Sequence, residues 1–487
     1  MPRSEPYERL GARRLGLSDG IGQSVGLMGP VFSAAFLIPL VAGVISASGR
    51  GGGVAAPLSV LIAAAGILAL ACVVAAYARE VPAAGSLYDY VSRGLGARAG
   101  TAAGWLYYCG LMVLLAGLLL LIGGYVQGTV QADFGVRPLP AWAWTLLAIA
   151  LVAAAGYFGV RLSARSQLAL ALVSILVVAA FLIMVIVRLG RANSWRPFSP
   201  AAASSGWPGI LFGALYGVLL FAGFETAANL AEETRRPRRS VPAAVLSSAA
   251  IAAVFLVLAA YAEVAGFHGR LQALTAAAGA PLFALGAPAA DGGYGGLWIE
   301  RLLELVVLLD LIAMAIGCSA AASRGLFAMA RDRRIPAALA VVSRRHGTPL
   351  GAGIFLVTTS AAALLVDQFW PSLVALPQTP HYLALFAWSA AFGGFALVVV
   401  YLLMCVGSLR SFAAARHRAQ LAVAAAVGIV ITAGAIYASF VQVTKPTIYA
   451  PWVALAVLGI GFASTFVLRA REPASARPVD LTGGGRL

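Results

Sequence analysis

Apolar runs recur twelve times along this chain of 487 residues, and short polar or arginine-rich stretches separate them. A transmembrane α-helix needs about 20 mainly apolar residues. The ninth and twelfth runs are short and require flanking residues to reach that length. The pattern therefore predicts twelve transmembrane helices, at residues 20–45, 54–77, 99–127, 142–160, 168–187, 207–230, 241–265, 302–322, 350–366, 383–406, 421–440 and 452–467.

The composition agrees with this pattern. Hydrophobic residues make up 61% of the chain and charged residues only 11%, whereas a soluble domain carries about 25% charged residues. We therefore predict an all-α integral membrane protein. The net charge of +16 is attributed to loops at the membrane surface, so membrane lipid is an expected partner and nucleic acid is not.

The four cysteines lie inside apolar runs, and the four histidines are scattered in or beside loops. These spacings fit neither a disulfide framework nor a metal site, and the sequence has no phosphate-binding G-x-x-x-x-G-K-[ST] motif. We expect no metal, no cofactor and no enzyme activity. A membrane-embedded enzyme is a remote alternative, because its chemistry would need a cluster of His, Asp or Glu side chains.

Basic residues are divided unevenly between the two sides of the membrane. Because the number of predicted spans is even, both termini fall on the same side. The segments on the other side hold only eight of the 34 basic residues, namely Arg50, Arg137, Arg188, Arg191, Arg196, Arg270, Arg301 and Lys445. Lys and Arg accumulate in cytoplasmic loops, so we predict a cell-membrane protein with both termini in the cytoplasm.

The first span reads DGIGQSVGLMGPVFSAAF, and glycines crowd its first half before Pro30. Proline removes a backbone donor and clashes with the preceding turn, and glycine lowers helix stability. We predict a break over residues 26–30. Main-chain polar groups freed at membrane depth are tolerated only in a protein-lined cavity. The alternative is close helix packing through small residues.

The sixth span reads FGALYGVLLFAGFETAANLAEE and carries Glu225 deep within its apolar part. Charged groups at this depth are rare and costly. If the helix breaks over residues 221–224, Glu225 opens the following half-helix, where a carboxylate is favourable. Glu225 is then either a site for a substrate amine or a proton, or a structural carboxylate that bonds a neighbouring helix.

Spans one and six run in opposite directions, because their positions in the order of spans differ by five, an odd number. We predict an inverted repeat of residues 18–190 and 191–409, followed by two added helices in 410–470. Residues 1–17 form a cytoplasmic N-terminus and 471–487 a disordered tail. Paired interrupted helices point to a transporter site whose half-helix N-termini hold an anion and whose freed carbonyls hold a cation. A zwitterionic amino acid meets both needs.

Three further stretches carry ordered motifs. YAREVPAAGSLYDYVSRGLGARAGTAAGWLYY follows span two, FAGFETAANLAEETRRPRRSVP ends span six, and SRGLFAMARDRRIPAALAVVSRRHGTP follows span eight. Their shared positions include Glu80, Pro82, Gly85, Tyr88, Tyr90, Gly104, Trp105, Phe221, Gly223, Phe224, Glu225, Glu232, Glu233, Pro237, Ser323, Arg324, Arg331, Asp332 and Pro336. Over residues 15–410 the chain resembles the amino acid–polyamine–organocation (APC) permeases.

This resemblance implies a leucine-transporter-like fold, with a five-plus-five inverted repeat and two C-terminal helices. It also implies where a substrate binds. The amino acid carboxylate would meet backbone N–H groups at Gly26, Leu27, Met28 and Gly29. The amine would meet carbonyls near Phe221, Gly223 and Phe224, beside Glu225. Tyr107 and Tyr108 of the third span either line this site or pack against other helices.

The resemblance leaves the coupling ion open. Some proton-coupled members carry a lysine in span five, where this chain has none. Sodium-dependent relatives of the fold use hydroxyls of span eight, and Ser319 and Ser323 stand there. Asp310, deep in the same span, is either a proton relay or part of a structural pair. The gating residues implied are Arg324 and Asp332, in cytoplasmic ion pairs, with Arg331, Glu80 and Arg93 beside them.

We therefore predict a secondary active permease that moves an amino acid by alternating access, with proton coupling or exchange. The alternative on the same fold is transport of a polyamine or another organocation. A polyamine would favour several acids at the site, and only Glu225 and Asp310 lie deep enough.

Overall fold

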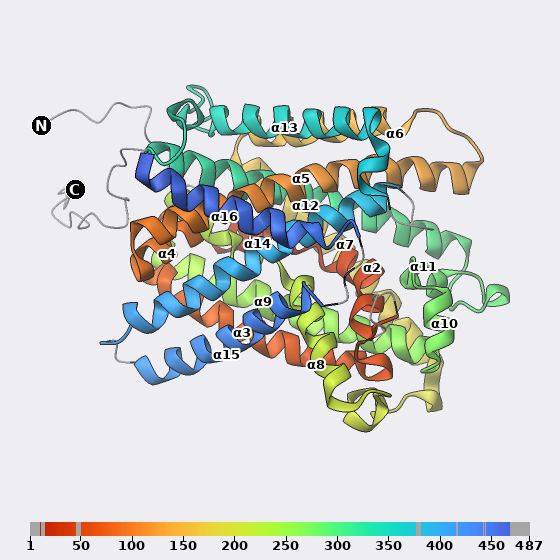
Figure 1. The fold of residues 1–487 in the computed structure, drawn as a ribbon. Helices are drawn as coiled ribbons and strands as arrows, with labels where there is room; N and C mark the ends of the chain where they lie inside the picture. The colour runs from red at the N-terminus through yellow and green to blue at the C-terminus, as the bar shows by residue number, and fades with distance from the viewer. Residues whose placement is uncertain are drawn as a thin grey trace, which may run out of the picture.

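Twelve apolar helical spans run through the computed structural model, which describes residues 10, 15–44, 50–375, 381–414, 417–441, 443 and 445–467 (Figure 1). The twelve spans predicted from the apolar pattern are confirmed, and the chain is a multi-pass membrane protein. Within the described ranges there is no β-strand, only the isolated bridges Leu15–Thr234 and Pro288–Gly295.

The first five spans are α1 (Leu17–Met28) with α2 (Pro30–Ala42), then α3 (Ala56–Glu80), α5 (Ala97–Phe134), α6 (Ala141–Phe158) and α7 (Val160–Leu189), with the short α4 (Leu87–Leu95) before α5. The next five are α8 (Gly206–Gly217) with the 3₁₀ helices η5 (Val218–Phe221) and η6 (Thr226–Glu233), then α9 (Pro237–Gly266), α12 (Leu297–Arg331), α13 (Leu350–Phe369) and α14 (His381–Ser411). Between α9 and α12 lie α10 (Leu271–Ala276) and α11 (Pro281–Gly286), and the chain closes with α15 (Arg418–Ala438) and α16 (Tyr449–Val467).

Helix bounds differ from the predicted runs mainly in α5, α7 and α12. These helices extend past the predicted 99–127, 168–187 and 302–322, because their polar ends continue the helix beyond the apolar stretch. The predicted end of the first span at residue 45, most of the N-terminal segment and the tail 471–487 lie outside the described residues.

Burial separates a central group of helices from a peripheral one. Within the most apolar window of each span, 83% of the residues of the α1–α2 span are buried, against 22% in α6, α13 and α16. The outer helices expose leucine, valine and aromatic side chains, as expected for surfaces that face lipid. The interrupted helices are therefore enclosed by protein.

One end of the bundle gathers basic residues. The N–H of Leu15 donates to the Glu233 carbonyl at 3.1 Å, before α1 begins, and Arg98, at the start of α5, lies over the Phe466 ring near the end of α16. The first helix therefore begins, and the last helix ends, at the same end of the bundle. We call it the arginine-rich end, for Arg93, Arg98, Arg235, Arg331 and Arg334.

The two interrupted spans lie against each other in opposite directions. The first half of span one, α1, contacts η6, the second half of span six, while α2 contacts α8. This antiparallel pairing was expected from the chain order. The larger symmetry, an inverted repeat of residues 18–190 and 191–409, stays a prediction.

Candidate substrate site

Gly29 separates α1 from α2 and adopts a φ of +55°. A Cβ at this position would lie 2.0 Å from Sδ of Met314 on α12. Both the left-handed backbone and the close contact therefore require glycine. Pro30 takes the first position of α2, where its missing N–H costs no helical bond. The predicted break in the first span is confirmed here.

The main-chain donors at this break belong to the start of α2. The N–H of Gly29 donates to the Val25 carbonyl at 3.3 Å, which ends α1 within its own turn. An α-helix leaves its first N–H groups without intrahelical acceptors, and after Pro30 these are on Val31 and Phe32. The N–H groups without intrahelical acceptors therefore lie in the first turn of α2. The family resemblance implied such donors one turn earlier, in the last turn of α1.

The sixth span is interrupted between η5 and η6. Ala222 is extended, with a ψ of 124°, and Gly223 has a φ of +111°. A Cβ on Gly223 would lie 2.9 Å from Cγ of Leu27, so the turn of span six packs directly on the last turn of α1. The predicted break over residues 221–224 is confirmed.

Side-chain hydroxyls fasten the two breaks together. The Ser24 hydroxyl donates to the Phe224 carbonyl at 2.8 Å and accepts from the N–H of Ala227 at 2.9 Å. Ser33 on α2 donates to the Leu220 carbonyl at 3.5 Å. These bonds satisfy backbone groups that an unwound membrane helix leaves free, and each carbonyl keeps a second lone pair for a further donor.

Glu225 stands at the N-cap position of η6 and is fully buried. The Tyr107 hydroxyl on α5 donates to its Oε1 at 2.8 Å, and the Tyr401 hydroxyl on α14 donates to its Oε2. Two hydroxyl donors and a helix N-terminus together stabilise a carboxylate in an apolar setting. Glu225 thus ties the break of span six to two neighbouring helices.

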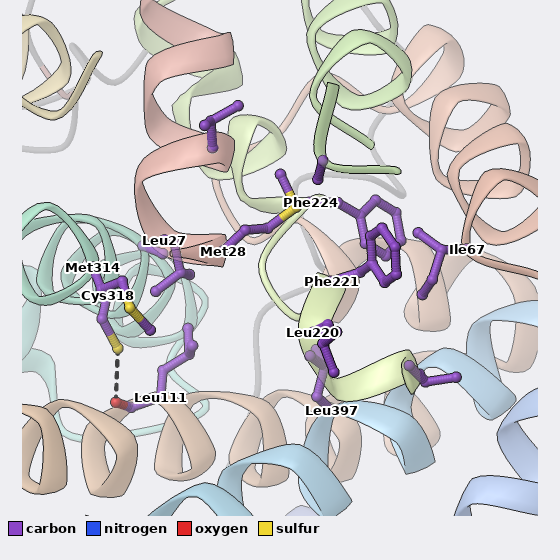
Figure 2. Packing of buried hydrophobic residues seen from close by; sticks show 14 of the residues in the cluster. Leu27, Met28, Ile67, Leu111, Leu220, Phe221, Phe224, Met314, Cys318 and Leu397 are labelled. Atoms are coloured by element: carbon purple, nitrogen blue, oxygen red, sulfur yellow. Dashed lines mark hydrogen bonds between the residues drawn. The ribbon is translucent and has the colours of Figure 1, made fainter. Parts of the chain in front are cut away.

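Apolar side chains surround the breaks (Figure 2). Phe221 and Phe224 lie close to each other beside Ile67 of α3, with the Met28 side chain pointing toward Phe224, while Leu27, Met314 and Cys318 form another side. Each of these is at most 6% exposed. In this conformation the region is closed to solvent.

Helix α12 supplies the eighth-span residues named from sequence. Asp310 is fully buried and accepts from the N–H of Phe32 at 2.8 Å. Ser323 donates to the Ala320 carbonyl of its own helix at 3.2 Å, and Ser319 is half-buried. Asp310 therefore contacts the interrupted helix, whereas the Ser323 hydroxyl bonds within α12.

The predicted gating residues form a layer of ion pairs at the arginine-rich end. Arg324 meets Glu233 at 2.5 Å, with both side chains at most 4% exposed, and Arg331 meets Glu232 at 2.8 Å. Asp332 accepts from the Tyr88 hydroxyl at 3.1 Å. The Glu80–Arg93 pair is 4.0 Å long and about half exposed, so it lies at the rim of this layer.

Asp89 of α4 lies inside the same layer and is 2% exposed. The net pKa of Asp89 is raised to about 8: burial raises it most, the charges of Asp332 and Glu232 add to the rise, and Arg331 and the N–H of Gly85 oppose it. The sequence analysis did not identify this group. Its only signal was an acid between two tyrosines in the loop after span two.

The two neighbouring tyrosines of α5 have different partners. Tyr108, named as a substrate residue, donates to the Gly85 carbonyl at 2.6 Å and lies near the arginine-rich end. Its neighbour Tyr107 is the one that reaches Glu225. The side chains of consecutive helical residues point about 100° apart. A sequence pattern that locates this turn of α5 therefore does not show which of the two tyrosines faces Glu225. Tyr401 was missed, since span ten matched no quoted motif.

A cavity of about 360 Å³ lies at the opposite end of the bundle, between α5, α6, α13 and α14. Its polar lining includes Gln131, Arg137, Asp367 and His381, and His381 Nε2 is 2.6 Å from Oδ1 of Asp367. None of the substrate residues named from sequence lines it.

Comparison with known proteins agrees with this arrangement. A sequence profile described as amino acid permease matches residues 23–467. The chain belongs to the amino acid permease family. This family consists of transporters rather than enzymes.

Named relatives are 23–26% identical to this permease over the aligned residues. A branched-chain amino acid permease of Bacillus subtilis is 24% identical over 348 residues, covering 66% of this chain and 70% of the relative. A methylthioribose transporter of the same organism is 26% identical, covering 64% and 66%. An aromatic amino acid transport protein of Salmonella typhimurium is 23% identical, covering 60% and 62%.

Proposed function

We propose that this permease is a secondary active transporter that moves an apolar amino acid across the cell membrane by alternating access. The observation that carries the proposal is the meeting of two antiparallel, interrupted helices inside the bundle, fastened by Ser24 and Ser33. Such breaks supply main-chain donors and acceptors at membrane depth.

The substrate carboxylate binds at the first turn of α2, and the amine binds at the carbonyls of residues 220–225 beside Glu225. A helix N-terminus attracts an anion, and a carbonyl that already accepts one bond has a second lone pair. Leu27, Met28, Phe221, Phe224 and Met314 receive the side chain. Their apolar character, with branched-chain and aromatic amino acid permeases among the relatives, favours an apolar amino acid.

The arginine-rich end faces the cytoplasm, by the distribution of basic residues. The pairs Arg324–Glu233 and Arg331–Glu232 form the inner gate and separate when the site opens inward. Residues 18–190 and 191–409 act as the two repeats, and the two added helices, within 410–470, lie outside them. A proton gradient, a sodium gradient or exchange for a second substrate can drive this cycle. If sodium drives it, Ser319 and Ser323 are the candidate sodium ligands.

Uptake by purified protein in liposomes tests the proposal. Labelled leucine, valine and phenylalanine are compared with putrescine and methylthioribose, with and without an inward proton gradient, at fixed and then at zero sodium. Saturable uptake of an apolar amino acid is expected. Uptake of putrescine alone would favour the organocation alternative, and uptake of methylthioribose alone would overturn the amino acid assignment. Loss of uptake at zero sodium would assign coupling to sodium.

A further inference from the structure

A carboxylate of the protein already occupies the start of α2. Asp310 on α12 and Phe32 on α2 are 278 residues apart in sequence, and the Phe32 N–H donates to Oδ2 of Asp310 at 2.8 Å. The favourable field of a helix N-terminus extends only over its first turn. Asp310 therefore lies where the proposed function places the substrate carboxylate.

The second oxygen of Asp310 is buried without a bond. Oδ1 has no hydrogen-bond partner among the described residues, and the residue is fully buried. Unsatisfied buried carboxylate oxygens are costly and call for an explanation. A proton on Oδ1, a substrate group beside it, or both would satisfy it.

No other titratable side chain lies at the level of Asp310 on the helices beside it. On α5 this level falls between Leu111, which accepts from Cys318, and Tyr125, which donates to the Glu304 carbonyl. On α7 it falls between Gln167 and Ser174, and α2 and α11 have no titratable residue. The remaining acids and tyrosines on the elements packed against α12 lie nearer the ends of the bundle or at the break of span six: Asp19, Tyr107, Tyr108, Asp133, Tyr157, Glu225, Glu232, Glu233 and Asp367.

Two ionised carboxylates cannot share this small donor set at low cost, because like charges at hydrogen-bonding distance oppose each other. Protonation of Asp310 removes the conflict. Oδ2 continues to accept from the Phe32 N–H, and the new Oδ1–H donates to the substrate carboxylate. The buried oxygen gains a partner in the same step.

We propose that Asp310 is the coupling residue of this permease and binds one proton together with each amino acid. This inference rests on the proposed function. The proton comes from the outer solution, resides on Oδ1 while the substrate carboxylate is bound, and leaves to the cytoplasm after the substrate. A zwitterion carries no net charge, so each cycle moves one positive charge inward.

The first test measures proton uptake on binding by the wild-type protein. Leucine is titrated calorimetrically in buffers of different ionisation enthalpy between pH 6 and pH 8. About one proton per leucine is expected, with the apparent Kd rising up to about tenfold per pH unit on the alkaline side. The amine isopentylamine, which lacks the carboxylate, should bind without proton uptake. Leucine binding with no proton uptake would overturn the inference.

The second test compares Asp310→Asn with Glu304→Gln, a change of another α12 acid six residues earlier. The asparagine oxygen accepts from Phe32 N–H and its amide donates to the substrate, so leucine binding and leucine exchange should persist. Proton-driven accumulation and proton flux should disappear in Asp310→Asn and remain in Glu304→Gln. Accumulation with proton flux in a folded Asp310→Asn would overturn the inference. Absence of any amino acid binding by folded wild-type protein would instead refute the proposed function.

Discussion

The Tyr107 hydroxyl donates to Oε1 of Glu225 at 2.8 Å and so joins α5 directly to the interrupted part of the sixth span. The Tyr401 hydroxyl holds the other oxygen. The carboxylate is fully buried, so each of these bonds replaces a water contact that the oxygen lost on folding. The geometry of the break depends on both tyrosines.

Tyr107→Phe should loosen this arrangement. The change leaves one oxygen of a buried carboxylate without its donor, at a cost of about 1–3 kcal/mol. We expect a lower Tm in detergent and a weaker Kd for leucine by calorimetry. Tyr108→Phe is the matched control, because Tyr108 bonds the Gly85 carbonyl instead. Equal Kd changes in the two variants would contradict this reading.

Glu225→Gln should reduce transport more than expression. The amide keeps the shape of the side chain, but its NH₂ group now faces a tyrosine hydroxyl that must turn from donor to acceptor. We expect slower leucine uptake per folded molecule in liposomes, with the folded fraction measured by size-exclusion chromatography. Normal uptake with a normal pH response would exclude any role of the charge in binding or proton transfer.

Gly29→Ala should abolish leucine binding. The new Cβ would lie 2.0 Å from Met314 Sδ on a backbone with a φ of +55°. Adding Met314→Ala removes the clash but not the backbone strain, so recovery should be partial. Gly156→Ala is the control, since its Cβ meets no atom within 4 Å. Wild-type affinity in Gly29→Ala would argue against a main-chain site at this break.

The buried Arg324–Glu233 pair should contribute far more to the free energy of unfolding than the exposed Arg93–Glu80 pair. Removing one partner of a buried pair costs about 3–5 kcal/mol, whereas exposed pairs are worth about 0–1 kcal/mol. We expect a large fall in Tm for Arg324→Gln, partial recovery on adding Glu233→Gln, and little change for Glu80→Gln. A double-mutant cycle on each pair gives the comparison, and similar coupling energies for the two pairs would be evidence against the burial argument.

The sequence predicted the spans and the two breaks because each depends on local chemistry. Apolar runs specify membrane helices, and the glycines with Pro30 specify where the first span is interrupted. Glu225 was identified because an acid inside an apolar span is rare. These features can be recognised without knowing which helices are neighbours.

The partners of these residues depend on contacts between distant helices. Tyr401 lies 176 residues from Glu225, and Asp310 lies 278 residues from Phe32. No local pattern pairs them, and a one-residue shift along α5 separates Tyr107 from Tyr108. The buried state of Asp89 was missed for the same reason, since Asp332 and Glu232 approach it from other parts of the chain.

Asp89 should make stability fall as pH rises. Its pKa is raised from 3.8 to about 8 in the folded protein, so between these values the folded state holds a proton that the unfolded chain releases. The stabilisation is complete below pH 4 and is lost progressively up to about pH 8, with a slope of about 1.4 kcal/mol per pH unit for one proton. Asp89→Asn should remove this contribution to the slope. Asp291→Asn, an exposed acid at the opposite end of the bundle, should retain it. Thermal unfolding in detergent from pH 5 to pH 8 measures the three slopes, and a wild-type slope in Asp89→Asn would show that another group carries the pH dependence.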